Sequence, residues 1–99
     1  MGSKDVEFHE AASLEYEAAF AWYLERSGRA ALRFVREVER AIASICEAPE
    51  RSPVGAGGTR RFLLQRFPFA VVYRELPSVI QVLAVAHGRR RPGYWKKRL

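Results

Sequence analysis

The stretch FAVVYRELPSVIQVLAVA, Phe69–Ala86, decides the fold that this sequence predicts. Two runs rich in β-branched residues, Phe69–Arg74 and Val79–Ala86, flank a short connection, LPS, at 76–78. Apolar runs of this length between turn residues are typical of buried strands, and so short a connection requires antiparallel neighbours. Because Val79–Ala86 is apolar on both faces except at Gln81, we expect it to be a central strand.

The segments before this stretch predict two more strands and two helices. Arg60–Gln65 has extended character, and Val6–Phe8 alternates apolar and polar residues. Glu10–Arg26 is rich in alanine and free of Gly and Pro, which favours a helix. After a break at Ser27-Gly28, an apolar stripe at helical spacing runs from Ala31 to Ile45. Two helices joined by so short a break are expected to form an antiparallel hairpin.

This order predicts an α+β fold. We expect an antiparallel sheet of three to four strands packed on an N-terminal helical hairpin, in the order β-α-α-β-β-β, followed by a basic C-terminal tail. A chain of 99 residues supports one domain over residues 1–99. The hairpin covers one face of the sheet, and no other segment promises a helix long enough for the second face. We therefore expect a partner protein to cover that second apolar face.

The charge is unevenly distributed along the chain. The net charge is +6, but residues 1–59 carry seven Lys/Arg against ten Asp/Glu, whereas residues 60–99 carry ten Lys/Arg against Glu75 alone. Such a positive field favours a polyanion or an acidic protein as partner. In the second helix, Arg33, Arg36, Glu37 and Arg40 lie away from the apolar stripe, and Arg33 and Glu37 have the spacing of an ion pair.

Other classes of protein are not indicated. The N-terminus MGSKDVEFHE lacks the apolar core of a signal peptide, and no run approaches the ~20 apolar residues that span a bilayer. Cys46 is the single cysteine, so no internal disulfide forms. We expect a cytoplasmic protein with no membrane contact, no metal and no cofactor.

Four segments in this order resemble the RelE/ParE superfamily of bacterial type II toxins. They are VEFHEAASLEYEAAFAWYLERS, AIASICEAPERSP, RRFLLQRFPFAVVYRE and VLAVAHGRRRPGYWKKR, and together they cover nearly the whole chain. The resemblance implies a small toxin that halts bacterial growth until a cognate antitoxin binds and neutralises it, in a hetero-oligomer. It also implies one of two targets, the ribosome with its mRNA or DNA gyrase.

The ribosome-dependent branch of the family implies metal-independent RNA cleavage, which needs a proton acceptor and donor and a cation beside the phosphate. For that chemistry the catalytic candidates are His87, Arg89 and Tyr94. Further residues are candidates for binding nucleic acid or another target, as phosphate clamps or stacking platforms: Arg60, Arg61, Arg74, Arg90, Arg91 and Trp95. An equal alternative is that the Pro92-Gly93 turn folds Tyr94 and Trp95 back onto the protein as core.

One departure from the nuclease pattern favours the gyrase-directed branch. Nuclease members of the family typically carry an arginine on the middle strand just before the apolar-apolar-Tyr segment, where this sequence has Ala70 in FPFAVVYRE. Alanine can neither clamp a phosphate nor donate a proton. The sequence therefore favours a gyrase-directed or otherwise non-nucleolytic toxin over a ribosome-dependent mRNA endonuclease. A nucleic-acid-binding module without toxicity is a third hypothesis.

Overall fold

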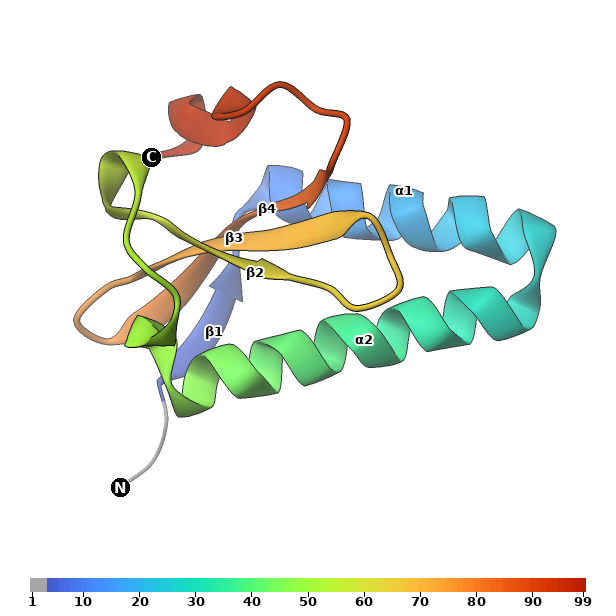
Figure 1. Cartoon of the computed structure of the whole chain (residues 1–99), viewed down its shortest axis with the longest axis horizontal. Coiled ribbons are helices and arrows are strands. Elements are labelled where there is room, and N and C mark those ends of the chain that lie inside the picture. The colour runs from blue at the N-terminus through green and yellow to red at the C-terminus, as the bar shows by residue number, and fades with distance from the viewer. Residues whose placement is uncertain (1–3) are drawn as a thin grey trace.

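The computed structural model describes residues 4–99, so the first three residues of the expected domain lie outside it. The strands and helices follow the predicted β-α-α-β-β-β order, and the α+β fold is confirmed (Figure 1). The elements are β1 (Asp5–Phe8), α1 (Glu10–Arg26), α2 (Gly28–Glu47), β2 (Arg60–Leu63), β3 (Phe69–Glu75) and β4 (Val79–His87). Three short 3₁₀ helices complete the described chain: η1 (Pro49–Arg51), η2 (Ala56–Gly58) and η3 (Tyr94–Arg98).

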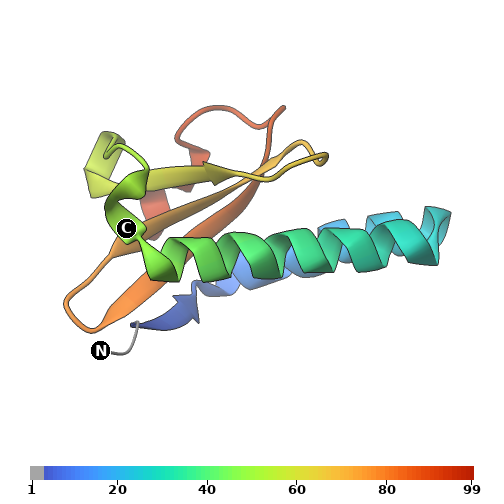
Figure 2. The same ribbon diagram turned by 60° about the horizontal axis from the view of Figure 1, so that its bottom comes forward.

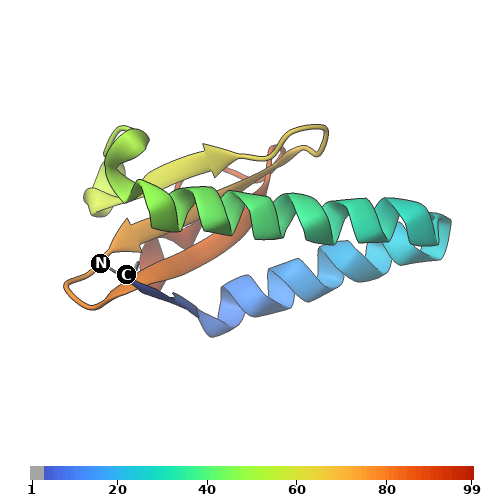
Figure 3. The same cartoon turned by 90° about the horizontal axis from the view of Figure 1, so that it is seen from below.

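Side-chain caps set the start of both long helices. His9 Nδ1 accepts a hydrogen bond from the backbone N–H of Ala11 at 3.0 Å, and Ser27 Oγ accepts one from Ala30 at 3.2 Å. Each cap satisfies an N–H that has no partner within the helix. Ser27 also ends α1: its N–H still donates to the Tyr23 carbonyl, but its backbone is extended, with φ −167° and ψ 120°. The two helices therefore turn sharply into an antiparallel hairpin that lies along one face of the sheet (Figure 3).

The sheet has the strand order β1-β4-β3-β2, so β4 is central, as predicted. The pairs β2–β3 and β3–β4 are antiparallel, but β1 pairs parallel to β4. Parallel pairing needs a long connection, which the hairpin and two intervening strands provide. The strand predicted at Arg60–Gln65 is shorter than expected, since β2 ends at Leu63. The N–H of Leu64 bonds to the carbonyl of Phe69, which starts the turn into β3.

A β-bulge interrupts the pairing of β3 with β4. Val72 pairs with Ala84 and Tyr73 pairs with Val82, which leaves Leu83 as the extra residue of β4. Leu83 and Ala84 consequently both join the cluster on the face away from the helices. On the helix side, the larger core packs both helices against the sheet, with Phe34, Val38, Ile45, Val71, Tyr73 and Val82 fully or almost fully buried.

The chain itself covers the centre of the second face, so the expectation of an open apolar face there is wrong. Leu63 of the edge strand β2, which pairs with Ala70, remains 64% exposed. Gly93 adopts a φ of 76°, a conformation that favours glycine, and turns the tail back over the sheet. Figure 2 shows η3 on the side of the sheet away from the helices. Trp95 is only 6% exposed there and packs with Val72, Leu83 and Ala84, all at most 1% exposed.

Small residues explain why so short a segment is sufficient. Ala70 pairs with Ala86, and by strand alternation both lie on the same face as Val72 and Ala84. The side chains on this part of the sheet are therefore short, and the single indole of Trp95 fills the space above them. Of the two roles considered for Trp95, the position in the core is the one observed.

Trp95→Ala is expected to lower the free energy of unfolding by about 3–4 kcal/mol, because it leaves a cavity over the sheet. Trp22→Ala is the matched control, since Trp22 is 51% exposed and its removal opens no cavity. Urea denaturation of both variants measures the difference. Equal, small losses of stability in the two variants would contradict the role of Trp95 as the cover of this face.

Candidate functional site

His87 ends β4 and is held in a defined orientation. Its ring lies edge-on to Phe69, with 5.0 Å between the ring centroids. His87 Nδ1 accepts a hydrogen bond from the N–H of Arg89 at 3.0 Å, and the His87 carbonyl accepts one from Arg90. Because Nδ1 is an acceptor, the proton of the neutral ring sits on Nε2. The ring is half-buried.

The arginines that follow His87 are exposed. Arg89, Arg90 and Arg91 form the turn between β4 and η3. The Arg90 guanidinium lies 3.8 Å from the ring centroid of Tyr94, a cation–π contact that orients it. These residues and His87 therefore form one cationic corner of the molecule, at the end of the central strand.

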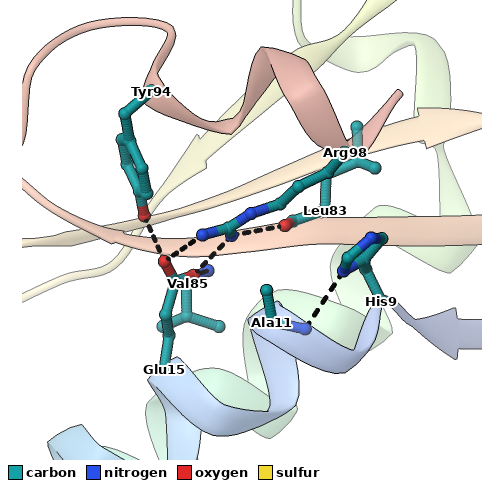
Figure 4. Close-up of polar contacts among 7 residues, drawn as sticks. All are labelled: His9, Ala11, Glu15, Leu83, Val85, Tyr94 and Arg98. Carbon is teal, nitrogen blue, oxygen red and sulfur yellow. Dashed lines mark hydrogen bonds and ion pairs between the residues drawn. The ribbon is translucent and has the colours of Figure 1, made fainter.

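Tyr94 and Arg98, on opposite sides of Trp95 in the chain, converge on Glu15 of α1 (Figure 4). The Tyr94 hydroxyl donates to Glu15 Oε2 at 2.7 Å. Arg98 binds the same carboxylate in bidentate fashion, with Nη1 3.0 Å from Oε1 and Nη2 2.8 Å from Oε2. The side chains of Glu15 and Arg98 are each only 16% exposed, so water screens this pair weakly.

The same ion pair satisfies the backbone of β4. β1 pairs only with Val79 to Val82, and beyond that point no strand of residues 4–99 lies beside this edge. Here Glu15 Oε1 accepts the N–H of Val85 at 3.0 Å, and Arg98 Nη1 donates to the carbonyl of Leu83 at 2.8 Å. The two side chains thus take the place of a neighbouring strand, as Figure 4 shows.

These contacts shift the pKa values of Glu15, Tyr94 and Arg98. Burial alone would raise the pKa of Glu15, but the hydrogen bonds from Arg98, Tyr94 and Val85 outweigh it and lower that pKa below its ordinary value of 4.5. Burial and the hydrogen bond to Glu15 raise the pKa of Tyr94 to about 12. The Glu15 carboxylate also raises the pKa of Arg98. Tyr94 is therefore a fixed hydrogen-bond donor near neutral pH.

A groove of about 420 Å³ lies between α1 and the unpaired end of β4. Its lining is largely apolar, and Glu15, His87 and Arg90 supply the ionisable and charged groups. The apolar residues come from α1 (Ala18, Ala19, Trp22, Tyr23), from the β2–β3 connection and the start of β3 (Pro68, Phe69), and from β4 (Val85). The groove therefore joins an apolar floor to one cation-lined end.

The three arginines expected on the sheet do not join this corner. Arg60 donates to the carbonyls of Glu50 and Ser52 and so holds the loop around η1. Arg74 Nε donates to Gln81 Oε1 at 2.8 Å across the β3–β4 pair. The register puts Arg60 opposite Tyr73 and Arg61 opposite Val72, so these two neighbours point to opposite faces of the sheet.

Sequence reasoning missed Glu15 and Arg98, which organise this end of the molecule. They are 83 residues apart, and no motif or spacing connects them. The groove was also missed, because it depends on where β1 stops pairing with β4. Within residues 4–99, no group of three or more His, Cys, Asp or Glu side chains is placed to hold a metal ion, and no helix is long and apolar enough to cross a membrane.

Glu15→Gln is expected to lower the free energy of unfolding by about 2 kcal/mol, because the partly buried Arg98 then loses its countercharge. The loss depends on pH. The lowered pKa of Glu15 stabilises the folded state above pH 4.5, and this stabilisation disappears as pH falls through the folded-state pKa. Urea denaturation should therefore show a constant gap between the parent and the variant above pH 4.5 that narrows in acid.

Glu17→Gln provides the matched control, since Glu17 lies on the same helix and is exposed. Its free energy of unfolding should stay within about 0.5 kcal/mol of the parent. A Glu15 variant as stable as this control would show that the ion pair does not support the tail.

Comparison with known proteins was made by sequence and by fold. The family model "ParE toxin of type II toxin-antitoxin system, parDE" matches residues 6–92. A solved structure described as "Chromosomal ParDE TA system from P. aeruginosa" is similar in fold, with a TM-score of 0.73 at 20% identity over 86% of this chain and 96% of that chain. No curated protein sequence matches the chain. The expected RelE/ParE membership is confirmed, and the chain belongs to the ParE toxin family of type II toxin–antitoxin systems.

Proposed function

We propose that this toxin inhibits growth by binding a protein target, DNA gyrase, without cleaving RNA. The observation that carries the proposal is the covered face of the sheet around Ala70. Ala70 is 5% exposed and lies on the face that Trp95 covers. RNA cleavage at that position would need a cation beside the scissile phosphate, and a buried alanine supplies none.

The state of the tail supports the same proposal. Tyr94 donates its hydroxyl proton to Glu15 and has a pKa of about 12, so it is a poor general base near neutral pH. Trp95 is buried and has no free face on which a base could stack. The exposed groups that remain at this corner, Arg89, Arg90 and Arg91, suit contacts with an acidic surface of a protein target.

A ribosome-dependent endonuclease is the alternative. One observation favours it, since His87 and Arg90 both line the groove and could serve as proton carrier and phosphate ligand. The enzyme would then act without the arginine expected on β3 and without Tyr94 as a base. That leaves His87, Arg89 and Arg90 as the functional groups to test.

We further propose that the cognate antitoxin occupies the groove beside β4. The N–H of His87 and the carbonyl of Val85 lie on the edge of β4 that β1 does not reach, so an extended peptide can pair with them. The alanines of α1 leave room for its side chains, and Arg90 favours an acidic residue at one end. Binding there would also cover the exposed face of Trp22.

Tightly controlled expression in bacteria, with pulse-labelling of DNA and protein synthesis, tests the target. DNA synthesis should fall before protein synthesis, and the purified chain should inhibit supercoiling by purified gyrase. His87→Ala should remain as toxic as the parent, because no proton transfer is involved.

The opposite order of arrest, with loss of toxicity in His87→Ala, would support the endonuclease. Expression without any growth defect would contradict both targets and leave the non-toxic nucleic-acid-binding module.

Ala18→Arg should separate toxicity from neutralisation. The long cation fills the groove, so co-expression of the cognate antitoxin should no longer restore growth, while toxicity itself persists. Pull-down should show at least a tenfold loss of antitoxin binding, equivalent to about 1.4 kcal/mol. Ala43→Arg, on the exposed side of α2, is the matched control and should be rescued normally. Full rescue of Ala18→Arg would place the antitoxin elsewhere.

A further inference from the structure

A second concave site lies on the other side of the β2–β3 turn. The turn approaches the N-terminal half of α2, as Figures 2 and 3 show, and together they enclose a cleft of about 580 Å³. Five of its lining residues are arginines: Arg29, Arg33, Arg36 and Arg40 from α2, and Arg66 from the turn. Glu37 is the one acidic residue in the lining. Hereafter we name this site the arginine cleft.

The periodicity of α2 produces this arrangement. Positions 29, 33, 36 and 40 are separated by four, three and four residues, so the side chains lie along one face of the helix. Residues 1–59 carry seven cations in all, and four of them are in this cleft although the segment as a whole is acidic. The concentration of charge is therefore local, and the net charge of the chain does not explain it.

Glu37 does not neutralise the cleft. Its Oε2 accepts from Arg40 Nη1 at 3.1 Å, and its Oε1 accepts the backbone N–H of Gln65 at 3.2 Å. The expected pair with Arg33 is not formed, and Glu37 instead binds Arg40 and ties the turn to the helix. Within residues 4–99, no salt bridge or side-chain hydrogen bond engages the other four guanidinium groups, those of Arg29, Arg33, Arg36 and Arg66.

The protein is destabilised by this arrangement in two ways. Like charges three or four residues apart on a helix repel one another, and α2 has a continuous series of them. Arg66 has a φ of 70°, the left-handed region in which glycine or asparagine is the easy choice. An arginine at that position adds backbone strain and one more cation to the cleft. The repulsion among the guanidinium groups is relieved when an anion binds between them.

We propose that the arginine cleft binds the phosphodiester backbone of a nucleic acid. The α2 arginines recur about once per helical turn of ~5.4 Å, a repeat that suits a ligand with one negative charge per unit. All five cations are arginines, whose planar fork binds phosphate oxygens in pairs. An acidic peptide fits less well, because the lining offers only Ala30 and the half-buried Phe67 as apolar anchors.

The proposal does not depend on the target of the toxin or on its antitoxin. The groove beside β4 is lined by α1 and by Pro68 and Phe69. The arginine cleft is lined by α2 and by Gln65, Arg66 and Phe67. The two sites are separate surfaces, so they can be altered independently.

Fluorescence anisotropy with the purified full chain tests the proposal. The probes are a labelled DNA duplex, a single strand of the same sequence and the matching RNA, and polyglutamate is the acidic-peptide probe. All nucleic acids should bind, with affinity falling steeply between about 50 and 200 mM salt. The strongest of the three identifies DNA or RNA as the source of the phosphates.

The double variant Arg33→Gln, Arg36→Gln should lose at least tenfold in affinity, and the slope of log affinity against log salt should fall by about 1.5. Lys96→Gln, Lys97→Gln is the matched control, with the same loss of charge at exposed positions outside the cleft. The control should keep the affinity within twofold of the parent and leave the slope unchanged.

Arg66→Asn distinguishes a binding role from a structural one. Asparagine tolerates the left-handed conformation better than arginine, so this variant should unfold at a higher temperature than the parent while binding nucleic acid more weakly. A residue that only supported the fold would not change these two readouts in opposite directions.

Three results would overturn the proposal. One is no binding of any nucleic acid at low salt, and another is an equal loss of affinity in the cleft and control variants. The third is tighter binding of polyglutamate than of nucleic acid, with the same dependence on Arg33 and Arg36, which would make the cleft a site for an acidic peptide.

Discussion

The structure depends on how the unpaired end of the central strand is satisfied. β1 pairs with only four residues of β4, and a partly buried ion pair satisfies backbone groups of the edge beyond them. Glu15 reaches it from the first helix and Arg98 from the tail, so one contact joins the hairpin, the sheet and the C-terminal segment. Here two polar side chains satisfy backbone groups of β4 that a neighbouring strand would otherwise bond. The space that such a strand would have filled remains as the groove.

The two faces of the sheet are packed with side chains of different size. The hairpin face uses large side chains such as Phe34 and Tyr73, whereas the other face uses alanines under a single indole. Because so few side chains cover this face, Trp95, Tyr94 and Arg98 are part of the structural framework, in which they pack on the sheet or bind Glu15. His87 and the three arginines that follow it lie outside that framework, and the arginines are exposed.

Local patterns in the sequence predicted most of the fold. Both ends of α1, the start of α2 and the central position of β4 follow from spacing, break residues and hydrophobicity. The cover over the second face was not predictable by the same means, because it depends on the small size of Ala84 and Ala86 and not on the length of a helix. The Glu15–Arg98 pair and the arginine cleft could not be predicted, because both are formed by segments that are distant in the sequence. Periodicity along α2 shows that four arginines share a face, but it does not show that the β2–β3 turn lies beside them.

The Glu15–Arg98 ion pair at the edge of β4 also bears on self-association of the protein. An uncovered strand edge is a template on which another molecule can add a strand, and natural proteins commonly guard such edges with charge. Glu15 and Arg98 guard β4 only while the carboxylate is ionised. Acid therefore weakens more than the fold, since loss of the ion pair leaves backbone groups of β4 available for pairing with a strand of another molecule.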